Sequence, residues 1–134
     1  MKPLVMITQR ATTEAIELLA SVCDVMRVNA RSYYARQELS LHARRAQGLM
    51  AVTPERIDDA LLVGCTRLRI VACTFRILEH IDIAACTRRG IWVTNVMTRE
   101  TGKEAEIEAA RNILDVLGGD TPRGALNEIL QPAA

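Results

Sequence analysis

The chain has 134 residues, 49% hydrophobic and 25% charged, with a formal net charge of +1, which predicts one globular domain with an ordinary core. Its 17 basic residues are offset by 16 acidic ones along the sequence, which argues against a nucleic-acid partner. No apolar run approaches the roughly 18 residues of a membrane span and no signal-peptide pattern opens the chain, so we expect a cytoplasmic protein without a membrane partner.

The first half of the sequence alternates short apolar segments with helical periodicity. Residues 4–8 (LVMIT) predict a first, central strand, and Thr12 or Thr13 is expected to cap the helix that follows. The apolar stripe of that helix is Ile16, Leu19, Ala20 and Cys23. Residues 24–28 alternate as an edge strand does, and a helix is expected over about 35–46.

The second half repeats the same alternation. The predicted strands are 49–52, 68–73 and 91–93, and Ile57, Leu61 and Leu62 mark a helix between the first two. A short helix is expected from Asp82 to Gly90. A longer one is expected over 98–117, with apolar positions Ile107, Ala110, Leu114 and Leu117, followed by a tail from Asp120 that wraps the surface or frays.

This order predicts an α/β protein in which five parallel strands alternate with five helices. The apolar runs are continuous, which is typical of a sheet covered by helices on both faces. A flavodoxin-like three-layer sandwich with strand order 2-1-3-4-5 competes with half of a dinucleotide-binding sheet. The turn at residues 8–11 contains no glycine, which favours the flavodoxin-like order.

Candidate site residues lie in the loops after the strands, because ligands bind at the carboxyl ends of such sheets. The sequence contains no glycine-rich dinucleotide motif, no P-loop and no nucleophile elbow. Arg76, in the loop 74–81, suits a carboxylate or another small oxyanion, although a solvated surface arginine is the alternative. Glu79 and His80 are a weaker acid–base candidate, and Asp82 is expected to cap a helix.

The four cysteines, at positions 23, 65, 73 and 86, form no C-x-x-C pair. The two histidines, His42 and His80, do not complete a metal-ligand spacing with them. We therefore expect reduced thiols in or near the core and no metal site.

The stretch VACTFRILEHIDIAACTRRGIWVTN resembles the substrate-binding domain of the D-2-hydroxyacid dehydrogenase family. In that family a loop of the form G-x-D-N-[IVF]-D precedes a helix ending A-x-x-x-G-[IV] and a strand ending T-N. The matching positions here are Asp82, Ala85, Gly90, Ile91, Thr94 and Asn95. The resemblance is greatest to the phosphite (phosphonate) dehydrogenase branch and covers residues 4–96.

The resemblance implies an unusual domain organisation. In the family, the strand ending T-N leads into an NAD-binding domain that carries the catalytic arginine, glutamate and histidine. Here residues 98–119 instead resemble the family's C-terminal helix. We therefore expect one flavodoxin-like substrate domain over 1–134, with an N-terminal segment over 1–97, the helix 98–119 joined where the NAD domain would be, and a tail over 120–134. No catalytic residue and no cofactor site are expected in this chain.

The resemblance also suggests the substrate-binding residues. Arg76 stands where phosphite dehydrogenases have a lysine that holds the anionic substrate, and Thr53 lies on a second loop of that cleft. The other expected contacts are Thr74, Phe75, Ile77 and Leu78. Ile77 replaces a family glycine, and Glu79-His80 replace Asp-Asn. These residues imply weak binding of a small oxyanion or a 2-oxo acid by a chain that is inactive alone.

Two further interpretations remain open. In one, the chain is a scaffold that forms a homodimer through the surface exposed by the missing domain, around Thr53, Phe75, Ile77, Leu78 and Met97. In the other, weaker one it is a flavin protein. The loop after the first strand lacks the Ser/Thr/Gly-rich phosphate cradle of such proteins.

Overall fold

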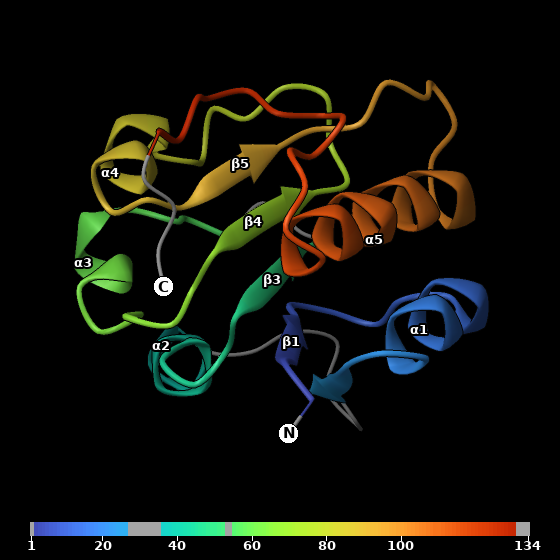
Figure 1. Ribbon diagram of the computed structural model, residues 1–134, viewed down its shortest axis with the longest axis horizontal. Helices are drawn as coiled ribbons and strands as arrows, with labels where there is room; N and C mark the ends of the chain where they lie inside the picture. Colours follow the sequence, from blue (N-terminus) through green and yellow to red (C-terminus); the bar gives the residue numbers. More distant parts are fainter. Residues whose placement is uncertain (1, 27–35, 53–54, 131–134) are drawn as a thin grey trace.

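The computed structural model describes residues 2–26, 36–52 and 55–130 (Figure 1). The strands are β1 (Leu4–Ile7), β2 (Asp24–Met26), β3 (Gly48–Ala51), β4 (Ile70–Cys73) and β5 (Trp92–Thr94). The helices are α1 (Thr13–Ala20), α2 (Arg36–Ala43), α3 (Asp59–Leu62), α4 (Ile83–Arg88) and α5 (Lys103–Leu117).

All strand pairs in the described portion of the chain are parallel, and the sheet order is β2-β1-β3-β4-β5. Strand β1 lies between β2 and β3, with Val5 opposite both Val25 and Gly48. The predicted α/β fold and its strand order are therefore confirmed. The carboxyl ends of β3, β4 and β5 lie along one edge of the sheet, where the loops of interest emerge.

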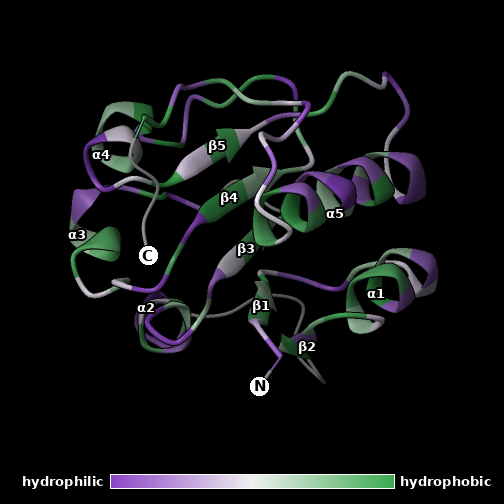
Figure 2. Ribbon diagram, viewed as in Figure 1, coloured by the Kyte–Doolittle hydropathy of each residue, from purple (hydrophilic) through white to green (hydrophobic). Residues whose placement is uncertain are grey.

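Helices cover both faces of the sheet, and each face has its own apolar cluster. Helices α2, α3 and α4 pack over Met6, Leu49, Val71 and Val93, whereas α1 and α5 pack over the alternate strand residues, such as Ile7 and Ile70. Figure 2 shows the same arrangement, with hydrophobic strands between helices whose polar surfaces face outward. No helix in the described ranges combines the length and apolar character that crossing a membrane requires.

Three sequence-based details need correction. In α1 the buried residues are Ala15 and Leu19, while Ala20 is exposed and Cys23 lies beyond the helix end. Ile57 precedes α3 and forms an isolated parallel bridge with Ile81. Cys23 and Ile57 lie outside their helices because both helices are shorter than the periodicity suggests, whereas Ala20 lies within α1 but on its exposed side.

The last helix also differs from its predicted bounds. It starts at Lys103 rather than at residue 98, because the chain first crosses the end of the sheet and turns at Gly102, whose φ is +64°. Its buried positions include Ala105, Ala109, Ile113 and Val116. Three of the positions that we expected to be buried, Ile107, Leu114 and Leu117, are only half-buried. The fourth, Ala110, is buried.

The chain after α5 wraps along β5. Thr94 and Ala125 form an antiparallel bridge, and the Leu126 N–H donates to the Val93 carbonyl at 2.8 Å. The Asn127 amide adds bonds to the main chain of Ile91 and Val93, each 2.9 Å long. The tail was expected either to wrap the surface or to fray, and residues 120–130 wrap the surface. This segment covers the edge of β5.

Candidate functional site

The loop 74–81 begins at the end of β4 and is anchored to the neighbouring strand. The Thr74 N–H donates to the Ala51 carbonyl at 3.1 Å, and the Thr74 hydroxyl oxygen lies 3.4 Å from the same carbonyl oxygen. Thr74 is half-buried, so both of its polar groups secure the start of the loop against the end of β3. The loop therefore lies at the carboxyl edge of the sheet, as predicted.

A second loop, between β3 and α3, runs beside the far end of the first. The Ile57 N–H donates to the His80 carbonyl at 3.0 Å, and the Asp82 N–H donates to the Ile57 carbonyl at 2.8 Å. The Asp82 carboxylate then accepts from the Ala85 N–H at 2.9 Å and caps α4, as expected. Thr53, the predicted contact on this second loop, lies outside the described residues.

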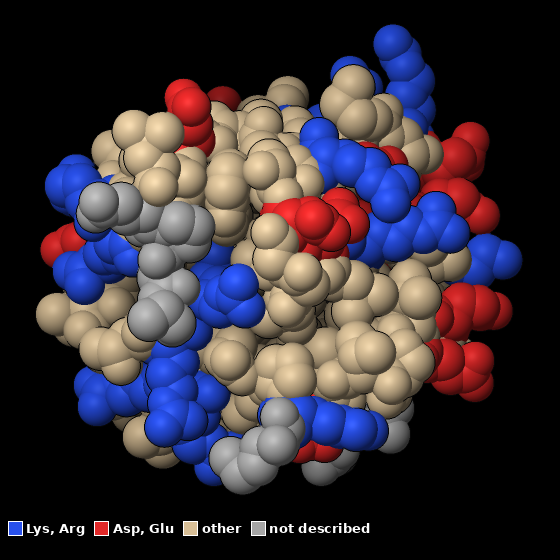
Figure 3. All heavy atoms as spheres, in the orientation of Figure 1, with Lys and Arg blue, Asp and Glu red and all other residues tan. Residues whose placement is uncertain are grey.

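Arg76 is an exposed cation at the tip of the first loop. Several other arginines are held in ion pairs, namely Arg36 and Arg56 with Asp58, Arg88 and Arg89 with Asp59, and Arg123 with Asp115. Arg76 pairs with no residue in the described ranges. Figure 3 shows basic and acidic side chains near one another both at the edge and near the middle of one face. Arg76 is thus an exposed cation without an ion pair among the residues that the structure describes, which suits contact with a ligand.

Main-chain N–H groups of the same loop are also available to a ligand. Within the described residues, the N–H groups of residues 75–80 donate no hydrogen bond. Ile77, beside Arg76, is 75% exposed. An exposed guanidinium next to unpaired main-chain N–H groups suits a small anion, because both kinds of donor bind carboxylate or phosphonate oxygens.

Phe75 and Leu78 have a different environment. Both are half-buried and pack against the apolar cluster beneath α2, α3 and α4. The Phe75 ring meets His80 edge-on, with the ring centroids 5.3 Å apart and the planes at 84°. These contacts give the loop a firm apolar base from which Arg76 and Ile77 project.

Burial of His80 against these apolar residues favours the neutral form of its imidazole. Burial lowers the pKa of the imidazole, and the nearby Glu55 carboxylate only partly opposes the shift. Its Nε2 atom is buried and has no partner among the described residues. Glu79 is exposed, and no hydrogen bond joins its carboxylate to His80 in the described ranges. The adjacent pair therefore lacks the geometry of a coupled acid and base.

The residues after β1 do not fit a nicotinamide dinucleotide. A dinucleotide-binding sheet holds the pyrophosphate on a glycine-rich turn and the helix N-terminus after β1. Here the turn 8–11 has no glycine, and the N–H of Thr12 donates to Glu106 Oε1 at 2.6 Å. Glu106 is only 7% exposed. A buried carboxylate in this position would repel a pyrophosphate.

The thiols and the other candidate ligands do not form a metal centre. In the described ranges no group of three His, Cys, Asp or Glu side chains is placed to hold a metal ion. All four cysteines are buried and free. Burial raises the pKa of Cys73 and of Cys86 to about 12, and it also raises the pKa of Cys23 and Cys65. These thiols are packing residues in the folded protein, as the sequence predicted.

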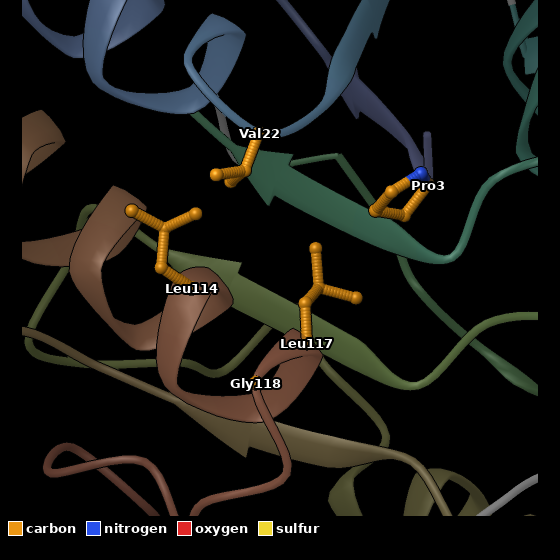
Figure 4. A pocket seen from close by; sticks show the side chains of 5 residues that line it. All are labelled: Pro3, Val22, Leu114, Leu117 and Gly118. Carbon is orange, nitrogen blue, oxygen red and sulfur yellow. The ribbon is translucent and has the colours of Figure 1, made fainter. Parts of the chain in front are cut away.

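An apolar hollow of about 400 Å³ lies at the opposite end of the molecule from the loop. Figure 4 shows the side chains of Pro3, Val22, Leu114 and Leu117 pointing toward one another around it. Pro3 precedes β1 and Gly118 follows α5, so the hollow belongs to the amino edge of the sheet. Its lining among the described residues is uncharged, so these residues suit an apolar group rather than an oxyanion.

Sequence reasoning missed the residues that support the loop from behind. Asn112 and Gly124 are buried and bond to each other and to half-buried Asn95, which the sequence analysis named only as a motif position, and Glu108 accepts from the N–H groups of Met97 and Thr98. The signal that could have found them is an asparagine on the apolar stripe of α5, because a buried amide needs polar partners.

Comparison with known proteins gives a consistent result. The family described as "D-isomer specific 2-hydroxyacid dehydrogenase, catalytic domain" matches residues 5–127. The glyoxylate reductase of Aeropyrum pernix is 34% identical over 120 residues, covering 85% of this chain and 36% of that protein. The glyoxylate reductase of Pyrococcus furiosus is 32% identical over 123 residues, covering 90% and 37%. The chain thus spans little more than a third of these relatives.

Solved structures show the same fold. The PH0520 protein from Pyrococcus horikoshii superposes with a TM-score of 0.66 at 29% identity, covering 72% of this chain and 28% of that one. An NADPH-dependent glyoxylate/hydroxypyruvate reductase from Sinorhizobium meliloti, solved with NADP and malonate, has a TM-score of 0.58 at 18% identity, covering 73% and 29%. The second likeness is one of fold alone.

Proposed function

The chain belongs to the D-isomer specific 2-hydroxyacid dehydrogenase family, and from this we propose that it is a substrate-binding domain that holds a small anion in the loop 74–81. The observation that carries the proposal is Arg76, an exposed cation without an ion pair in the described ranges, beside main-chain N–H groups that are also unpaired there. The expected cytoplasmic location also remains a proposal.

The first ligand class to consider is a short 2-oxo acid. Relatives that cover most of this chain are glyoxylate reductases, and glyoxylate presents a carboxylate that a guanidinium recognises. Phosphite is the second class, and it rests only on the motif resemblance expected from the sequence, since the relatives reported above are glyoxylate reductases. Arg76 suits either anion, because its planar fork can donate two parallel hydrogen bonds to the oxygens of a carboxylate or of a phosphorus oxyanion.

The chain alone is expected to be inactive. Hydride transfer needs a nicotinamide cofactor held against the substrate and a group to take the proton. The residues after β1 do not fit the cofactor, since the turn has no glycine and the Thr12 N–H before α1 already donates to the Glu106 carboxylate. We therefore assign no catalytic step to these residues.

The domain organisation remains a proposal. We infer that residues 1–97 and the helix over 98–119 are two pieces of one discontinuous domain, joined directly. The support is packing, because α5 contacts α1, β3, β4 and β5. Glu108 of α5 accepts hydrogen bonds from the main chain of Met97 and Thr98, at the joint itself.

An NMR titration of the ¹⁵N-labelled chain tests the proposed function. Glyoxylate, phosphite and NAD are added separately, and we expect saturable shifts from the first or second, confined to residues 74–82. Arg76→Gln should weaken binding about 10-fold or more, since a charge-assisted hydrogen bond is worth roughly 1.5–3 kcal/mol. Arg67→Gln, a change at another exposed arginine, is the matched control.

Two results would overturn it. The first is the absence of a saturable shift from either anion. The second is equal weakening by Arg76→Gln and Arg67→Gln, which would mean that the anions respond only to overall charge. Separately, NADH formation from NAD and D-glycerate or phosphite above a buffer control would contradict the expected inactivity.

A second candidate function is self-association through the same surface. Ile77 is 75% exposed and Met97 is 76% exposed, and both lie at the carboxyl edge of the sheet. A second copy is the proposed occupant. Light scattering should show a dimer that Ile77→Glu with Met97→Glu abolishes, while Leu41→Glu with Val63→Glu, at exposed positions on α2 and beside α3, leaves it intact. A monomer at high concentration contradicts this candidate.

A further inference from the structure

Asn95 connects three regions of the molecule through hydrogen bonds. It directly follows β5, and its N–H donates to the Gly124 carbonyl at 3.2 Å. Its carbonyl accepts from Asn112 Nδ2 of α5 at 3.3 Å. Its side-chain Nδ2 donates to the Arg76 carbonyl at 3.1 Å. The main chain of Asn95 therefore faces the C-terminal segment, whereas its side chain holds the candidate binding loop.

The group behind Asn95 is rigid. Asn112 is 2% exposed, and its Oδ1 accepts from the Gly124 N–H at 3.0 Å, so both ends of its amide are bonded. A side chain at position 124 would place its Cβ 2.4 Å from the Asn95 carbonyl oxygen and 2.9 Å from Asn112 Nδ2. Only glycine permits this approach. Asn95 is thus fixed to α5 and the tail.

Two successive carbonyls of the loop are held against this fixed segment. The Val96 N–H donates to the Phe75 carbonyl at 3.4 Å, and the Asn95 amide donates to the Arg76 carbonyl. A peptide unit is planar and trans, so its N–H points opposite to its C=O. The N–H groups of Arg76 and Ile77 must then point away from β5. Neither N–H donates a hydrogen bond within the described residues, so both donors remain for a ligand.

We infer that Asn95 is the positioning residue of the anion-binding loop. It orients the peptide between Arg76 and Ile77, so that the Ile77 N–H and the guanidinium of Arg76 converge on one ligand. This inference rests on the proposed function. It goes beyond it by assigning the preorganisation of the loop to a residue that does not touch the ligand.

The side chain of Asn95 can be removed without disturbing the group behind it. Its bonds to Gly124 and Asn112 use main-chain atoms, which remain in Asn95→Ala. The Arg76 carbonyl that loses its donor belongs to an exposed residue and can bond to water instead. The variant should therefore fold, and its effect should be confined to the loop.

The test compares Asn95→Ala with Asn127→Ala. Asn127 is a matched control because its amide also ties main chain to β5, but through Ile91 and Val93, away from the loop. Titration with glyoxylate and phosphite should show at least 5-fold weaker binding for Asn95→Ala and less than 2-fold change for Asn127→Ala. The ¹⁵N heteronuclear NOE of residues 75–78 should fall only in Asn95→Ala. Asn95→Ser serves if the alanine variant is poorly folded.

The outcomes separate this inference from the proposed function. If the unaltered chain binds neither anion, the proposed function fails, and the loop NOE values still decide whether Asn95 orders the loop. If the unaltered chain binds and Asn95→Ala binds within 2-fold with an equally ordered loop, the positioning role is wrong. Equal weakening by both variants also overturns it, because that result would reflect general loss of stability.

Discussion

At the residue scale, two buried thiols illustrate how the core constrains chemistry. Cys73 ends β4 and Cys86 lies on α4, and both belong to the apolar cluster under α2, α3 and α4. Burial raises the pKa of each to about 12 from an ordinary 9.0. Their interaction with each other raises the pKa of Cys73 further. The folded protein therefore favours the neutral thiols, and the unfolded chain does not.

This difference predicts a loss of stability in alkaline solution. A group whose pKa is higher when folded stabilises the fold below its unfolded pKa, and this contribution is lost as the pH rises through the folded pKa. The window is therefore about pH 9 to 12. Three pKa units correspond to about 4 kcal/mol, an upper figure for one thiol. Urea unfolding at pH 8.5 and 10.5 measures the loss.

Cys86→Ala provides the control for that measurement, because alkaline solution can destabilise a protein through groups other than these two thiols. The variant should start less stable at pH 8.5 and then lose less free energy of unfolding than the unaltered chain up to pH 10.5. Parallel losses in the two proteins would show that other groups cause the alkaline instability.

His80 predicts a pH effect of the opposite sign. Its pKa is lowered on folding, mainly by burial, so the fold loses stability as the pH falls from the ordinary value of 6.5 toward the folded pKa. His80→Phe keeps an aromatic edge against Phe75 and removes the titrating group. The free energy of unfolding should then fall less between pH 7 and 5 than in the unaltered chain. Chemical denaturation at the two pH values measures this fall. If the free energy of unfolding falls equally in His80→Phe and in the unaltered chain, His80 is not the cause of the pH effect.

The candidate site was predictable in its location and only partly in its construction. Arg76 stands in the loop after an apolar strand, which is where parallel sheets place ligand contacts, so the sequence alone indicated it. The contacts among Asn95, Asn112 and Gly124 could not be inferred in the same way, because these residues are far apart in the sequence. Asn95 lies 17 residues before Asn112, and Asn112 lies 12 residues before Gly124. No local spacing encodes such a group.

At the element scale, the short helices depend on their caps. Helix α3 has only four residues, Asp59–Leu62, and Asp58 caps it by accepting from the Leu61 N–H at 3.1 Å. Asp58 also pairs with Arg36 at the start of α2, at 2.6 Å. The hydrogen bond from Leu61 is the main cause that lowers the pKa of this carboxyl, and Arg36 adds to it. One side chain therefore fixes the entry of two helices.

Replacing this cap should show which of its two roles matters more. Asp58→Ala removes both contacts and should destabilise the protein by about 1 kcal/mol, the usual cost of a lost cap. Asp58→Asn keeps an oxygen acceptor for the Leu61 N–H and should cost less. Thermal or urea unfolding of the two variants measures the difference. Equal losses would mean that the ion pair with Arg36, rather than the cap, stabilises the structure.

Helix boundaries were the least predictable feature of the elements. The strands were found because buried parallel strands are continuous apolar runs, as in Ile70–Cys73. Helix α5 was expected from residue 98, but residues 98–102 cross the end of the sheet before the helix can lie on its face. The distance between the end of β5 and the start of α5 depends on the fold. The start of the helix therefore cannot be read from the local sequence alone.

At the scale of the whole molecule, α5 completes the domain. Its buried residues Ala109, Ile113 and Val116 fill the apolar cluster that also contains Val5, Ile70 and Trp92. Three of its polar side chains bind main-chain groups elsewhere, Glu106 at Thr12, Glu108 at Met97 and Thr98, and Asn112 at Asn95 and Gly124. Without α5, the part of this face formed by β3, β4 and β5 would be exposed, and three loops would lose their support.

The proposed joining of two sequence segments into one domain therefore predicts that neither segment is stable alone. Residues 1–97 expressed without the remainder should lack cooperative unfolding, because that face of the sheet would lie open to water. Within the full chain, Ile113→Ala should cost about 2–5 kcal/mol, since Ile113 is fully buried, whereas Val63→Ala, at a 61% exposed position, should cost within about 0.5 kcal/mol. Circular dichroism with urea unfolding measures both. A cooperative transition in residues 1–97 alone would mean that the sheet with α1 to α4 is already a domain, and that α5 is an addition to it rather than its second half.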